Sequence, residues 1–206
     1  SPTATGFLAF SHGLNTSSGT VSKTVGSHTV TLSDLATGTS DGGFTSRGSL
    51  TDSGAFTYAD LYDDFGFDKF GPFTVAIEGG SLAANTPYHL RIFTYDYHSA
   101  VYDFGTSVTM SYTPTSGVTG SPIAVSFTAG VAPTGNLDYS GFGTFTSNSA
   151  GQLVFDVTSD TNDLSGRPRT FINGFEILEV PEPTSIMLLA CCAAGALTRR
   201  RLELCG

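Results

Sequence analysis

Short segments in which polar and apolar residues alternate are the feature that most constrains the fold of this chain. In residues 105–113, Val108, Met110 and Tyr112 alternate with serine and threonine. A period of two is that of a strand with one buried face. Further short strand-like segments, separated by glycine, proline and asparagine, lie at 7–10, 28–32, 73–78, 88–97, 123–128, 143–146, 152–157 and 170–180. The sequence therefore predicts an all-β fold, an antiparallel β-sandwich.

Two segments depart from simple alternation. Residues 88–97 carry bulky groups on both faces, which predicts a central strand whose second face is covered. Residues 58–69 contain the only helical spacing before residue 180. Tyr58, Leu61 and Phe65 lie on one side of this expected helix, and Gly66 ends the turn.

The same segment concentrates four carboxylates within nine residues: Asp60, Asp63, Asp64 and Asp68. These groups repel one another unless a positive charge neutralises them, and calcium prefers oxygen ligands of this kind. The spacing is not that of an EF-hand. A structural calcium site and a solvated acidic turn are the two interpretations.

A second cluster begins near the end of residues 88–97 and continues beyond it. It consists of six aromatic and polar residues, Tyr95, Asp96, Tyr97, His98, Tyr102 and Asp103. Aromatic rings stack on the apolar faces of sugars, and carboxylates accept hydrogen bonds from sugar hydroxyls. The cluster predicts a glycan-binding platform, and the alternative is a core strand that runs into an ordinary loop.

Charge and cysteine content restrict the partners. The formal net charge is −9, and up to Val180 there are sixteen acidic and six basic residues. This sign disfavours binding to nucleic acid or anionic lipid. The three cysteines, Cys191, Cys192 and Cys205, all lie near the C-terminus, so the preceding residues have no disulfide.

The last 27 residues have a different organisation. Pro181, Glu182 and Pro183 precede an apolar run at 186–197, which is followed by the basic cluster Arg199, Arg200 and Arg201. As a helix the run is about 18 Å long, which is shorter than a comfortable membrane span. The arginines favour the cytoplasmic side, so we expect the body to lie across the membrane.

This tail resembles the PEP-CTERM sorting signal of bacteria that secrete exopolysaccharide. The resemblance divides the chain into a body, 1–179, and a sorting segment, 180–206, which inserts transiently into the membrane as a short helix. It implies processing near the Pro-Glu-Pro element by an exosortase-type protease, and export of the body to the cell surface or extracellular matrix. An ordinary C-terminal anchor is the alternative, and residues 202–206 extend beyond the arginines where such tails usually stop. Because export requires a leader, we expect this sequence to be a mature form or a fragment.

The body has a resemblance of its own. Residues 143–178, GTFTSNSAGQLVFDVTSD followed by a loop and FINGFEIL, resemble the closing strands of galactose-binding-like jelly rolls of the malectin and carbohydrate-binding-module type. The resemblance implies a β-sandwich, often with a structural calcium, and sugar contacts from loops at one end. We expect Asn173 to hold the geometry of the final strand.

No motif for catalysis stands in the context that its chemistry needs. The sequence has no HExxH and no cysteine before residue 180, and its GxSxG match at 38–42 lies in a glycine-rich segment with no helical pattern directly after it. We therefore expect a protein that is not an enzyme. Three functions remain: a polysaccharide-binding module, a structural matrix protein without a defined ligand, and a glycan-processing enzyme that uses a carboxylate pair such as Asp96 and Asp103.

Overall fold

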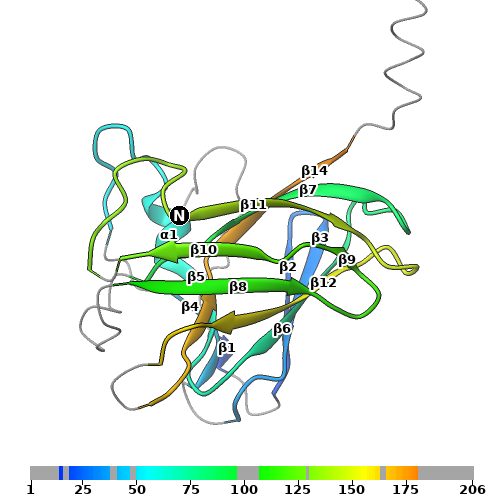
Figure 1. The fold of residues 1–206 in the computed structure, drawn as a ribbon, viewed down its shortest axis with the longest axis horizontal. Coiled ribbons are helices and arrows are strands. Elements are labelled where there is room, and N and C mark those ends of the chain that lie inside the picture. The colour runs from blue at the N-terminus through cyan, green and yellow to red at the C-terminus, as the bar shows by residue number, and fades with distance from the viewer. Residues whose placement is uncertain are drawn as a thin grey trace, which may run out of the picture.

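The chain folds into antiparallel β-sheets with one short helix in the part that the structure describes (Figure 1). The computed structural model describes residues 14–15, 19–37, 41–46, 50–96, 107–128, 130–162 and 166–180. Residues 181–206, which include the helix expected in the sorting segment, and the strand expected at 7–10 lie outside these residues. The expected all-β class is confirmed.

The largest sheet has six strands in the order β10-β8-β12-β6-β3-β2. Its strands are β2 (Val21–Val25), β3 (His28–Ser33), β6 (Phe73–Gly79), β8 (Val108–Pro114), β10 (Ile123–Phe127) and β12 (Leu153–Ser159). Five of the six were predicted from the sequence. In β8 the alternating side chains Val108, Met110 and Tyr112 are fully buried, as a period of two requires.

Two four-stranded sheets complete the fold. The β5 sheet has the order β1-β4-β5-β13 and the β7 sheet the order β14-β7-β11-β9. The β5 sheet consists of β1 (Leu14–Asn15), β4 (Gly42–Ser46), β5 (Asp64–Asp68) and β13 (Thr170–Ile172). The β7 sheet consists of β7 (Pro87–Phe93), β9 (Thr119–Gly120), β11 (Ser140–Thr146) and β14 (Gly174–Glu179). As predicted, β7 is a central strand.

The helical prediction for 58–69 is wrong beyond Asp63. Helix α1 spans only Ala59–Asp63, and β5 begins at the next residue. Strand β5 pairs with β4 on one side and β13 on the other, so its backbone hydrogen bonds come from the sheet. Gly66 lies inside the strand, where a Cβ would approach Leu32 Cδ1 to 2.8 Å. Tertiary pairing and packing override the local spacing here.

Buried side chains from all three sheets form one continuous core that is rich in aromatic rings. Tyr112 packs edge-on against Phe155, and its hydroxyl donates to the carbonyl of Phe171 at 2.9 Å. The hydroxyl of Tyr62 donates to the carbonyl of Asp138. Burial raises the pKa of both phenols, so they remain protonated donors within the core.

Asn173 joins the two four-stranded sheets at the point where the chain leaves β13 and enters β14. Asn173 is only 1% exposed. Its Oδ1 accepts the amide of Tyr95 at 2.6 Å, and its Nδ2 donates to the carbonyls of Tyr62 at 2.8 Å and Asp64 at 3.3 Å. Its own amide donates to the carbonyl of Phe93 at 2.9 Å. The expected role of Asn173 in the geometry of the final strand is confirmed.

We expect Asn173→Ala to lower the free energy of unfolding by about 3 kcal/mol, because it leaves a buried amide and a buried carbonyl without partners. Urea unfolding of the 206-residue chain measures the change. The matched control is Asn162→Ala at an exposed position, where a change within about 0.5 kcal/mol is expected. Equal effects of the two substitutions would show that the side chain of Asn173 does not stabilise the junction.

Candidate functional site

The structure describes two residues of the predicted glycan platform, and both are buried. Tyr95 is 0% and Asp96 is 7% exposed. The ring of Tyr95 stacks on that of Tyr139, with centroids 5.1 Å apart and planes inclined by 5°. This ring packs within the core and does not lie on the surface. Tyr97, His98, Tyr102 and Asp103 lie outside the described residues.

The four aspartates of the predicted calcium site do not act together: Asp68 and Asp63 accept hydrogen bonds from different backbone segments. Asp68 Oδ1 accepts the amides of Phe70 at 2.7 Å and Gly71 at 2.9 Å, and its Oδ2 accepts the amide of Ala36. Asp63 Oδ1 accepts the amide of Leu50 at 3.0 Å. Asp60 is partly exposed on α1, and Asp64 begins β5. Within the described ranges, no three carboxylate, imidazole or thiol groups lie close enough to share a metal ion.

We expect Asp68→Ala to destabilise the protein by about 3 kcal/mol, because three backbone amides lose a charged acceptor at a residue only 2% exposed. Thermal and urea unfolding measure this loss. Since the carboxylate acts on backbone amides, we expect the same loss in excess calcium and in excess chelator.

Asp60→Ala, with a partly exposed side chain, is the control, and a change within about 0.5 kcal/mol is expected. A melting temperature that rises with calcium in the unmodified chain, but not in Asp68→Ala, would instead support a cation at the aspartates.

An open surface with ring, cationic and acidic groups lies on the outward side of the β7 sheet. Its central row is Phe142, Arg91 and Glu176, which face one another across β11, β7 and β14. The next row is Thr144, His89 and Leu178. We call these six residues the β7 face. The alternate residues of β7, Tyr88, Leu90 and Ile92, point into the core and are at most 2% exposed.

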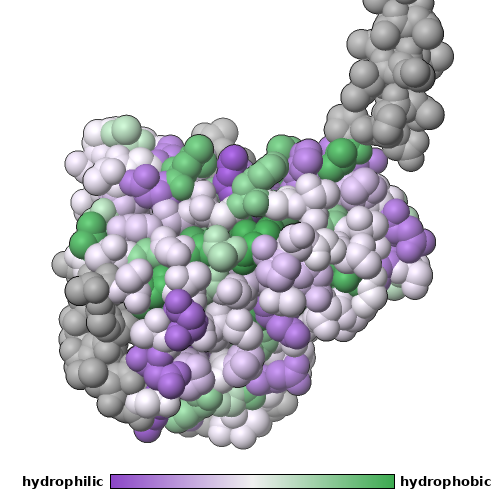
Figure 2. Space-filling view, in the orientation of Figure 1, coloured by the Kyte–Doolittle hydropathy of each residue, from purple (hydrophilic) through white to green (hydrophobic). Residues whose placement is uncertain are grey.

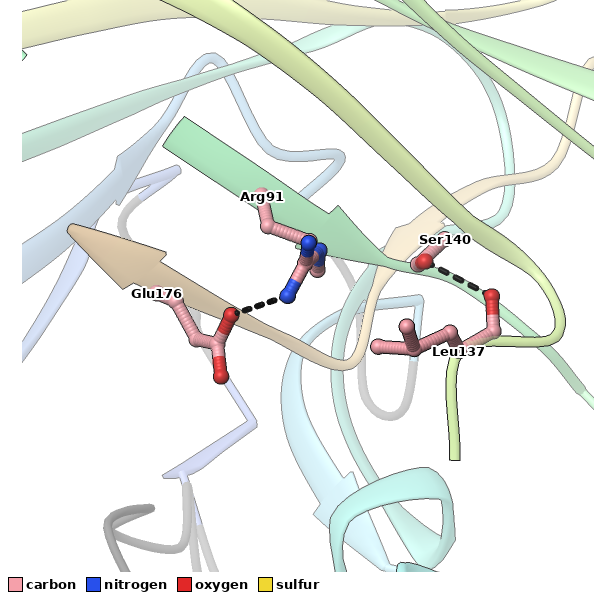
Figure 3. Close-up of polar contacts among 4 residues, drawn as sticks. All are labelled: Arg91, Leu137, Ser140 and Glu176. Atoms are coloured by element: carbon pink, nitrogen blue, oxygen red, sulfur yellow. Dashed lines mark hydrogen bonds and ion pairs between the residues drawn. The ribbon is translucent and has the colours of Figure 1, made fainter. Parts of the chain in front are cut away.

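Polar and ring contacts order the β7 face. Arg91 Nη1 donates to Glu176 Oε2 at 2.9 Å (Figure 3). The guanidinium carbon of Arg91 lies 5.6 Å from the centroid of the Phe142 ring, and the imidazole of His89 lies 5.2 Å from it. His89 Nδ1 is also 3.0 Å from Thr144 Oγ1. These contacts hold the Phe142 ring in place beside the ion pair.

The apolar groups of the face are open to solvent. Phe142 is 58% and Leu178 is 63% exposed. In the same orientation as Figure 1, Figure 2 shows hydrophobic side chains in separate patches among polar ones across the upper part of the molecule, where β7, β11 and β14 lie. Singly exposed apolar side chains are ordinary on a protein surface, so the contacts of the Phe142 ring distinguish this face more than its exposure does.

Helix α1 defines where the face ends. Beyond Arg91 the next residue on this side of β7 is Phe93, which is 0% exposed because Tyr58 and Tyr62 pack edge-on against its ring. Opposite Phe93 on β14 is Gly174, where a Cβ would approach Leu61 Cδ1 to 2.5 Å. The helix therefore covers this row and leaves the next two rows open. The covered second face expected for β7 occurs only at Phe93.

The turn before β11 brings a further exposed apolar group, Leu137, which is 57% exposed. Ser140 Oγ donates to the carbonyl of Leu137 at 2.7 Å (Figure 3). The carboxylate of Asp138 accepts the amide and hydroxyl of Thr134 and the amide of Gly135. The bonds from Thr134 lower the pKa of Asp138, so the carboxylate stays ionised and holds the turn.

Sequence reasoning predicted the strands of the β7 face but not the site. Arg91 and Glu176 are 85 residues apart, and no local spacing indicates their pairing. The available signal for the site was that His89 and Arg91 lie on the same side of a strand predicted to be central. That side of the strand was expected to be covered, so it was not considered as a binding surface.

In comparisons with known proteins, no family model matches the chain and no curated protein is significantly similar to it. Within the described residues, no helix is long and apolar enough to span a membrane.

Proposed function

We propose that this protein is an exported bacterial surface or matrix protein whose body binds polysaccharide without cleaving it. The observation that carries the proposal is the β7 face, where the exposed Phe142 ring contacts Arg91 and His89 and lies in one row with Arg91 and Glu176. Rings of this kind contact the apolar faces of sugars, while paired charged groups bind their hydroxyls. Export is supported by the sequence of the tail, Pro181-Glu182-Pro183 with Arg199, Arg200 and Arg201.

The finer fold assignment belongs to the same proposal. We infer a β-sandwich of the galactose-binding-like jelly-roll type, in which 143–178 supplies the closing strands. The antiparallel sheets around one core support it. In this proposal sugar contacts come from a sheet face and not only from end loops.

Non-catalytic binding fits the described carboxylates better than glycan cleavage. Asp96, one member of the pair considered for an enzyme, is 7% exposed. Glu176, the carboxylate on the open face, forms an ion pair with Arg91. A glycosidase needs two carboxylates that flank the scissile bond, and the β7 face supplies one.

Binding can be tested by native affinity electrophoresis of the 206-residue chain in mild detergent. We expect its migration to be retarded in gels that contain a suitable polysaccharide, relative to a non-binding reference protein. After incubation with the protein, the polysaccharide should keep its original length when it is analysed by size-exclusion chromatography. Unretarded migration across a broad panel of polysaccharides would favour the structural matrix protein, and shortened polymer would favour the enzyme.

Sorting can be tested in a bacterium that carries an exosortase. We expect replacement of Pro181, Glu182 and Pro183 by alanine to leave the chain unprocessed in the membrane fraction, because the protease recognises this element in the proposed route. The unmodified chain should appear shortened at the surface or in the medium. The control replaces Leu202, Glu203 and Leu204, which follow the arginines and should not be needed. Identical processing of all three chains would contradict the sorting proposal.

A further inference from the structure

We propose that the β7 face binds a neutral polysaccharide, with Arg91 and Glu176 bonding adjacent hydroxyls of a sugar whose apolar side contacts Phe142. This inference rests on the proposed function and adds the place of binding and the chemical class of the ligand.

The ion pair presents unused donors beside unused acceptors. Arginine has five N–H groups in one plane and a carboxylate has two oxygens. In the part of the chain that the structure describes, the side-chain hydrogen bond of Arg91 is the one to Glu176 Oε2. The other N–H groups and Glu176 Oε1 remain for a ligand, and both side chains are about 30% exposed. Each sugar hydroxyl both donates and accepts, so two neighbouring hydroxyls match this pair.

Forming these bonds requires little rearrangement. An exposed ion pair contributes only about 0–1 kcal/mol to stability, so hydroxyls can share its donors and acceptors at low cost. The contacts of the Phe142 ring with Arg91 and His89 already fix the ring, which reduces the entropy lost on binding.

The face has the dimensions of a short length of polymer. Three strands extend across about 10 Å, and the two rows are about 7 Å apart along the strands. Phe142 and Leu178 lie at opposite corners of this rectangle, with Arg91 and Glu176 completing one side. The diagonal between Phe142 and Leu178 is then about 12 Å, so two linked sugar rings, and not one, can contact both apolar groups and the ion pair together.

Charge favours a neutral ligand over an acidic one. The charges of Arg91 and Glu176 cancel on the face itself. The chain as a whole carries −9, which repels a polyanion at long range. A uronate bound to the other N–H groups of Arg91 would also place a second carboxylate beside Glu176, and like charges repel. A neutral polymer meets none of these costs, and its binding should be nearly independent of salt.

The test is affinity electrophoresis of the 206-residue chain in gels that contain a neutral galactomannan, a neutral β-glucan or acidic alginate. We expect the chain to be retarded in a gel that contains a neutral polysaccharide. Its affinity for that polysaccharide should change by less than about twofold between low and high salt. Phe142→Ser should weaken this affinity about tenfold, which corresponds to about 1.4 kcal/mol. Because Phe142 is 58% exposed, its replacement should leave the melting temperature nearly unchanged.

Two further variants separate binding from structure. Phe70→Ser is the matched control, because Phe70 is 44% exposed and has the Arg167 guanidinium 4.7 Å from its ring centroid, outside the β7 face. It should bind like the unmodified chain. Glu176→Gln should reduce neutral binding by less than about fivefold but should increase retardation by alginate, because Arg91 is then an uncompensated cation.

The possible failures are distinguishable. Neutral binding that survives Phe142→Ser would overturn the β7 face as the site and leave the proposed function standing. Retardation by alginate alone would overturn the neutral ligand class. Unretarded migration in every gel would overturn both the inference and the proposed binding function.

Discussion

The hydrogen bonds of Asn173 are the interaction on which the arrangement of the β7 sheet depends. One residue separates β13 in the β5 sheet from β14 in the β7 sheet. Asn173 satisfies the backbone at this junction through Tyr95, Tyr62 and Asp64. It thereby fixes which residues of β14 face β7. Because side chains alternate along a strand, a slip of one residue would turn Glu176 toward the core and separate it from Arg91.

The short helix α1 has a second, complementary effect. A five-residue helix is not stable alone, so its packing on Phe93 and Gly174 holds it in place. In return it buries one row of the sheet, and the open rows begin at Arg91. The segment 58–69 does not continue as a helix because Phe65 and Phe67 are buried as parts of β5, which pairs with β4 and β13.

Strands could be predicted from this sequence, but their neighbours could not. Alternation alone identifies the buried side of β8, because the burial of Val108, Met110 and Tyr112 follows from the two-residue period of a strand. The β7 face instead combines β7, β11 and β14, which are distant in the chain and meet through sheet topology. The same limit applies to the aspartates of 58–69, since closeness in sequence did not bring their carboxylates together. Tyr95 shows the converse, because an aromatic residue in a polar segment is a core residue here.

The energies available on the β7 face indicate what kind of binding it suits. One exposed ring contributes about 0.5–1.5 kcal/mol and an exposed ion pair about 0–1 kcal/mol, so a single face would hold one sugar unit weakly. A long polymer presents the same unit many times, and neighbouring copies of the protein in a matrix would bind it together. Linked weak contacts give high avidity without any strong individual site. A shallow, charge-balanced sheet face therefore fits retention within a polysaccharide layer better than capture of a free sugar, for which an enclosing pocket would be required.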